Sequence, residues 1–78
     1  MGFEYKIAFL VPDPVEAQAV LDRLRSVFLD AMGTDFTVSL ESDGFYFCDH
    51  TRSDRSSCAF RRLVDEALSH SKVIVHEL

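Results

Sequence analysis

The sequence predicts an α+β fold in which a four-stranded antiparallel sheet, with strand order 4-1-3-2, carries two helices on one face. Segments with apolar residues at every second position, as in strands, alternate with segments whose apolar residues recur every three or four positions, as in helices. Their order along the chain is strand, helix, strand, strand, helix, strand. With 78 residues the chain has room for one hydrophobic core, so we expect a single domain over residues 1–78.

The first strand is predicted over Phe3–Val11, where every odd-numbered position carries a large apolar or aromatic side chain. We expect this odd face to point to the core. A helix is predicted to follow, because Asp13 suits the N-cap and Pro14 suits the first helical position. Its apolar stripe predicts an end near Met32, with Gly33 as the C-terminal cap.

A hairpin is predicted next, because alternation resumes over residues 35–41 and Asp43-Gly44 suits a two-residue turn. With this turn, Leu40 would lie opposite Phe47, and both Phe45 and Phe47 would point to the core. The other face of the third strand would then carry Tyr46, Cys48 and His50.

A second helix is predicted up to Leu68, beginning between Asp54 and Ser57, and Lys72–Leu78 reads as a last strand. Helices on one face of the sheet and right-handed crossovers give a ferredoxin-like, split βαβ sandwich. Its other sheet face would be open. We expect that face to bind a protein partner or a second copy of the chain.

Charge and composition restrict the partners. Asp and Glu total 13 and Lys and Arg total 8, so a net charge of −5 disfavours nucleic acid. No run approaches the roughly 18 apolar residues of a membrane span, and a membrane partner is not expected. Two cysteines and the lack of a secretory signal favour a cytoplasmic location. No motif for a cofactor is present, so we expect none.

The stretch Gly44–His50 resembles the RNP1 motif of RNA-recognition domains, which lies on the third strand of a βαββαβ fold. That resemblance implies aromatic side chains that face outward and stack on bases. The hairpin register instead turns Phe45 and Phe47 to the core, and the net charge opposes RNA. We therefore expect no RNA binding.

Cys48 and His50 are the neighbouring residues best suited to chemistry. Both residue types bind metals, and a cysteine can act as a nucleophile with histidine as its base. Two positions apart on a strand, their Cα atoms are roughly 6.6 Å apart, which does not give a ready-made hydrogen bond. A zinc site needs three or four ligands. We therefore expect no metal site and no catalytic residue, and interpret the chain as a protein that is not an enzyme.

An anion-binding loop is a further candidate, because residues 51–78 carry 5 basic and 4 acidic side chains, against 3 and 9 in residues 1–50. Guanidinium groups and free N–H donors at a helix start suit a small anion such as phosphate. The alternative is a solvated loop that only caps the helix. The candidate residues are Arg52, Arg55, Ser56 and Ser57.

The expected function is that of a small acidic, non-enzymatic protein-binding module, for example an immunity or inhibitor protein for a basic partner. The candidate partner-binding residues are Asp22, Asp35, Glu41, Tyr46 and His50. One alternative is a small-ligand regulatory domain, since the βαββαβ order is similar to that of ACT domains. In the turn Val11–Val15, however, prolines stand where such domains would have a ligand-contacting glycine. Another alternative is a small domain that dimerises through its sheet.

Overall fold

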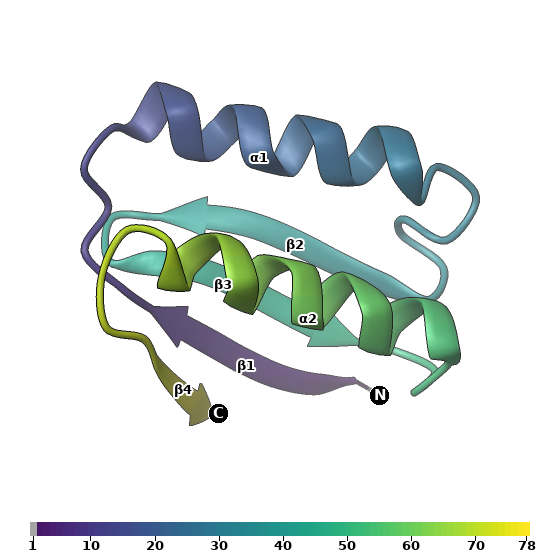
Figure 1. The fold of residues 1–78 in the computed structure, drawn as a ribbon. Helices are drawn as coiled ribbons and strands as arrows, with labels where there is room; N and C mark the ends of the chain where they lie inside the picture. The colour runs from purple at the N-terminus through teal and green to yellow at the C-terminus, as the bar shows by residue number, and fades with distance from the viewer. Residues whose placement is uncertain (1) are drawn as a thin grey trace.

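The computed structural model describes residues 2–78 and shows the predicted order of elements (Figure 1). The elements are β1 (Phe3–Ala8), α1 (Pro14–Val27), β2 (Phe36–Glu41), β3 (Gly44–Asp49), α2 (Asp54–Leu68) and β4 (Ile74–Glu77). The strands form one antiparallel sheet in the order β2-β3-β1-β4. This is the predicted order 4-1-3-2, read from the opposite edge.

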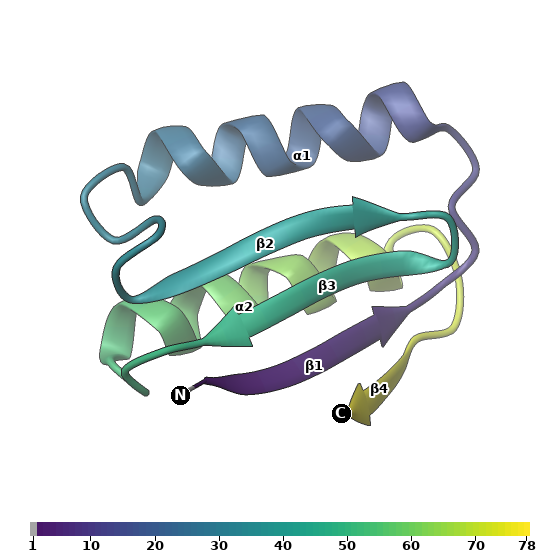
Figure 2. The ribbon, with the colours of Figure 1, turned by 180° about the vertical axis from the view of Figure 1, so that it is seen from behind.

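Both helices lie on one side of the sheet, and the view from behind shows the other sheet face uncovered (Figures 1 and 2). Helix α1 packs on β2, whereas α2 packs on β3 and β1. Strand β4 pairs with β1 and lies at the margin of the helix layer. All four of its residues are exposed to solvent.

Helix α1 begins as predicted and ends earlier than predicted. The Asp13 carboxylate caps it by accepting a hydrogen bond from the Val15 N–H at 2.9 Å. The helix ends at Val27 and not near Met32, so the predicted C-terminal cap is wrong. The chain turns because Phe28 leaves the helix to pack edge-to-face on a strand aromatic ring, and the following turns run to residue 35.

The hairpin loop is Ser42-Asp43, one residue earlier than predicted. Gly44 therefore lies in β3 opposite Glu41, and Leu40 pairs with Phe45 instead of Phe47. The partner shifts by two residues, so no side chain changes face. The predicted inward orientation of both phenylalanines is confirmed, because Phe45 and Phe47 are fully buried.

The core lies between the helices and the sheet. Aromatic rings fill its centre, with Phe36 stacked on Phe47 at a centroid distance of 5.3 Å. The largest side chains that are fully buried are Ile7, Leu21, Phe36, Phe45, Phe47 and Leu63. Phe3 was expected on the core face but is 43% exposed. Phe3 begins β1 at the end of the sheet, where the Arg52 guanidinium lies over its ring.

Candidate binding groove

A groove of about 810 Å³ lies along the flank of α2, next to β1 and β4. It exists because α2 packs on β3 and β1, so the helix-side surface of β4 has no helix above it. The groove is mostly apolar. Tyr5 packs edge-to-face on Phe60 at a centroid distance of 5.2 Å, and Val64 and Val75 extend the apolar surface on either side. The lining residues are Tyr5, Phe47, Asp49, Arg52, Ser57, Phe60, Arg61, Val64 and Val75.

Two arginines stand at the groove. The Arg52 guanidinium lies over the Phe3 ring, 3.7 Å from its centroid, and the Arg52 backbone has a positive φ of 54°. Neither Arg52 nor Arg61 has a carboxylate within ion-pair distance among residues 2–78. The one carboxylate of the lining, Asp49, accepts hydrogen bonds from two backbone N–H groups, at 2.8 and 3.3 Å. The groove lining therefore carries two arginines and one carboxylate, and neither arginine is in an ion pair among residues 2–78.

The edge strand β4 borders the groove. Val75 faces it, while Ile74 and Leu78 are exposed at 61% and 65%. An exposed apolar edge strand is a template for pairing with another chain, which proteins ordinarily avoid by placing charges or proline there. Here the strand Ile74–Glu77 carries one acidic residue, and no proline.

The four predicted anion-binding residues are not brought together. Arg52 and Ser57 line the groove. Arg55 instead pairs with Asp30 at 2.6 Å, and this guanidinium lowers the pKa of that carboxyl. Ser56 is buried, and its hydroxyl donates to the backbone carbonyl of the helix cap at 2.9 Å. An anion site formed by all four residues stays a prediction, and of the four only Arg52 and Ser57 line the groove.

The five predicted partner-binding residues also lie apart. Asp22 is on α1, in the helix layer, and pairs with Arg25 at 3.5 Å. Asp35 precedes β2 and accepts a hydrogen bond from the Ser53 hydroxyl at 2.8 Å. The open sheet face and its margins carry the other three residues, which are Glu41, Tyr46 and His50.

The charged side chains of the open sheet face bond to one another. Lys6 forms ion pairs with Asp43 and Glu41, and their carboxylates raise the pKa of Lys6. Lys6 in turn lowers the pKa of the Asp43 carboxyl. The Tyr46 hydroxyl donates to the Glu4 carboxylate at 2.5 Å; this bond, with desolvation, raises the pKa of Tyr46. These groups are already satisfied within the chain.

Cys48 and His50 approach more closely than the strand spacing suggested. The Cys48 Sγ lies 3.8 Å from the His50 Nδ1, and the Thr37 hydroxyl lies 3.4 Å from the His50 Nε2. The expectation that Cys48 and His50 form no hydrogen bond was wrong, because His50 lies beyond the end of β3. There its backbone N–H donates to the Asp35 backbone carbonyl. Within residues 2–78, no group of three or more His, Cys, Asp or Glu side chains is placed to hold a metal ion.

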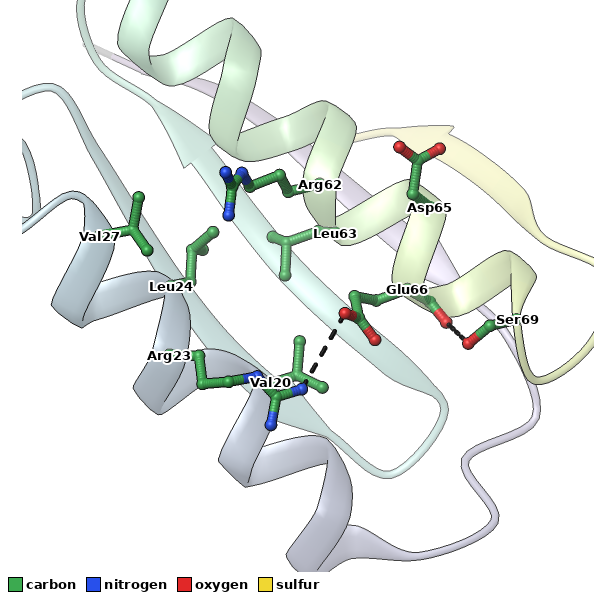
Figure 3. A pocket seen from close by; sticks show the side chains of 9 residues that line it. All are labelled: Val20, Arg23, Leu24, Val27, Arg62, Leu63, Asp65, Glu66 and Ser69. Carbon is green, nitrogen blue, oxygen red and sulfur yellow. Dashed lines mark hydrogen bonds and ion pairs between the residues drawn. The ribbon is translucent and has the colours of Figure 1, made fainter.

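A second groove, of about 370 Å³, runs between the helices (Figure 3). Val20, Leu24 and Leu63 form its floor, and all three belong to the buried core. Arg23 and Glu66 approach to 3.9 Å across its mouth, from α1 and α2. This groove is smaller and bridged by an ion pair, so the groove beside β4 is the better candidate for a binding site.

Sequence reasoning missed most of the groove. In the sequence, Phe60 and Val64 recur at helical spacing on the apolar stripe of the second helix, and Tyr5 is on the core face of the first strand, so no pattern marks them as groove residues. In the structure all three are partly buried against the core. Only the basic residues gave a signal, since Arg52 was a candidate anion-binding residue and Arg61 is one of the 5 basic residues in residues 51–78.

Comparison of the chain with protein-family models, with curated proteins and with solved structures finds no match. Among the described residues, no helix combines the length and the apolar character needed to cross a membrane.

Proposed function

We propose that the chain is a small protein-binding module whose binding site is the groove between α2 and β4. The observation that carries the proposal is the apolar groove surface directly beside an exposed edge strand that presents the apolar residues Ile74 and Val75. Surfaces of this kind mark interaction sites, because their exposure to water is unfavourable. Aromatic and arginine side chains, such as Tyr5, Phe60 and Arg61, are enriched at the centres of protein interfaces.

The groove lining offers contact surface and charge, which is why we infer binding and not catalysis. The proposal keeps the ferredoxin-like arrangement, which the βαββαβ order and the sheet order support. It also favours an anionic partner, because Arg52 and Arg61 have no carboxylate partner in the described chain. A basic partner, as expected from the net charge, stays a prediction. So does a dimer through the open sheet face.

A second candidate function is binding of a small anionic ligand with an apolar part. Arg52, Arg61 and the exposed Ser57 line the same groove, whose volume of about 810 Å³ is within the range of small-molecule sites. This function predicts a rise in melting temperature with an organic acid or a phosphate-bearing metabolite at millimolar concentration. The rise should be lost in Arg52→Gln.

Site-specific photo-crosslinking in source cells tests the proposed function. A benzophenone amino acid replaces Ser57, which is exposed in the groove lining, and in a matched control it replaces Ser26, which is exposed on α1. We expect a crosslink from position 57 to one short segment of a single protein, identified by mass spectrometry. The same products from both positions, or none from position 57, would contradict the proposal.

A further inference from the structure

Among residues 2–78, the backbone groups at the outer edge of β4 have no hydrogen-bond partner in the sheet. The Leu78 N–H donates to the Glu4 carbonyl at 2.9 Å, in line with the register that pairs Lys6 with His76 and Ala8 with Ile74. Hydrogen-bonded pairs alternate with non-bonded pairs along an antiparallel ladder. The even-numbered residues of β4 therefore bond to β1, and the N–H and C=O groups of Val75 and Glu77 point away from the sheet.

The side chains of the same two residues lie on the sheet face that carries the helices. Val75 lines the groove, and Glu77 lies opposite Tyr5, whose ring forms part of the groove surface. A strand added beside β4 would place every second side chain on this face, next to Val75 and the flank of α2. Backbone pairing and apolar contact would then be available to one extended segment.

Charge determines where an acidic residue of that segment would lie. The Arg52 guanidinium lies over the ring of Phe3, two residues before Tyr5. Because Tyr5 pairs with Glu77 in an antiparallel register, Phe3 and Arg52 lie beyond the C-terminal end of β4. An acidic residue would meet Arg52 there. Directly opposite Glu77 an acidic residue would be repelled, since like charges facing each other across strands are destabilising. The favoured groove-facing pattern is apolar opposite Val75, neutral opposite Glu77, and acidic beside Arg52.

We propose that β4 binds an extended segment of the partner as a fifth, antiparallel strand, with an acidic residue of that segment beside Arg52. This inference rests on the proposed function and gives it a partner chemistry. Antiparallel pairing is chosen because it is slightly more stable per residue than parallel pairing. Adding a strand to a sheet edge is a general mode of peptide recognition, in which the main chain gives affinity and alternate side chains give specificity.

The probe is a fluorescent peptide, Glu-Ser-Thr-Ser-Val-Ser-Val, with blocked ends, whose odd positions follow the predicted pattern. Binding is measured by fluorescence polarisation with the full chain. In Val75→Pro the N–H that points outward is lost, while the bonds to β1 are kept. Val75→Ala is the matched control, because it shortens the side chain and keeps the N–H.

We expect Val75→Pro to weaken binding by about tenfold more than Val75→Ala, from loss of one backbone hydrogen bond and its geometry. Arg52→Gln should weaken binding and reduce its dependence on salt, as should Gln in place of the peptide's Glu. Circular dichroism and the urea midpoint of each variant check that it is folded.

Two outcomes would overturn the inference and leave the proposed function standing. Equal binding by Val75→Pro and Val75→Ala would show that the segment lies in the groove without pairing to β4. A dimer in sedimentation experiments, lost in Val75→Pro, would show that the edge binds a second copy of the chain. Absence of peptide binding at millimolar concentration would also overturn it, and the crosslink from position 57 would then decide the proposed function separately.

Discussion

Gly44 allows β3 to lie close to β1 at the hairpin. Its φ is +149°, and a Cβ built there would overlap the carbonyl oxygen of Ile7 in the neighbouring strand. Gly33 also has a positive φ, of +84°, but a Cβ there would meet nothing within 4 Å. A side chain at position 44 is thus disfavoured by both the backbone conformation and the neighbouring strand, whereas at position 33 it is disfavoured by the backbone conformation alone.

We expect Gly44→Ala to lower the free energy of unfolding by about 2 kcal/mol or more, because the added methyl must push β1 away. Gly33→Ala should cost about 1 kcal/mol, the usual strain of a left-handed residue with a Cβ. Urea unfolding of the two variants beside the wild type measures both values. Equal losses would contradict the close approach at Gly44.

The Tyr46–Glu4 hydrogen bond predicts a pH dependence. The pKa of Tyr46 is raised in the folded chain, so its contribution to stability is full below the unfolded pKa near 10 and is lost as pH rises through the folded pKa. The pKa of Lys6 is also raised, and its contribution falls in the same alkaline window. We therefore expect Tyr46→Phe to make the decline of the urea midpoint above pH 10 shallower without abolishing it.

A second measurement isolates the phenol. The tyrosinate absorbance that is missing in Tyr46→Phe belongs to Tyr46, since the chain has one other tyrosine, Tyr5. In Glu4→Gln this absorbance should appear at lower pH than in the wild type, because the carboxylate that disfavours ionisation is removed. An unchanged titration would mean that Glu4 does not hold the Tyr46 hydroxyl in solution.

At the scale of elements, the sequence was enough for what depends on local pattern. The cap at Asp13, the strand alternation and the inward turn of Phe45 and Phe47 were predictable, because each follows from spacing within a few residues. The end of α1 was not, since the helical spacing continues past Val27 and the chain leaves it to place Phe28 against a strand. That contact is between elements, so no local pattern reports it.

Along β4, backbone N–H groups that bond to β1 alternate with N–H groups that point to the free edge, and hydrogen exchange can distinguish the two kinds. The N–H groups of His76 and Leu78 bond to β1, whereas those of Val75 and Glu77 point to the free edge. We expect the first pair of amides to exchange more slowly than the second, by about tenfold, in NMR exchange measurements. Uniform fast exchange across residues 74–78 would mean that β4 is not stably paired.

At the scale of the whole molecule, the candidate site depends on how α2 is placed over the sheet. Phe60 and Val64 read as core residues because the sequence gives the apolar stripe of the helix but not the strands below it. The structure places α2 over β3 and β1, which leaves one flank of that stripe beside an uncovered β4. Such an offset between layers arises only from the packing of all six elements.

The same offset predicts that β4 can be removed without loss of the fold. Among residues 2–78, none of the buried core side chains belongs to β4, and Val73 is only partly buried against that core. Deleting Val73–Leu78 should lower the free energy of unfolding by about 2–4 kcal/mol, through the lost ladder to β1. The free energy of unfolding of a domain of this size is about 4–12 kcal/mol, so a folded population should remain after the deletion.

Near-UV circular dichroism and urea unfolding of the truncated chain measure this directly. Retained aromatic signals from the packed phenylalanines, with loss of binding to the peptide probe, would show that β4 serves the site more than the core. A spectrum of an unfolded chain would contradict this division, because the ladder to β1 would then be needed for the core itself. The exposed apolar residues of β4 would in that case reflect a structural role, and their exposure would no longer favour a partner at the edge of the sheet.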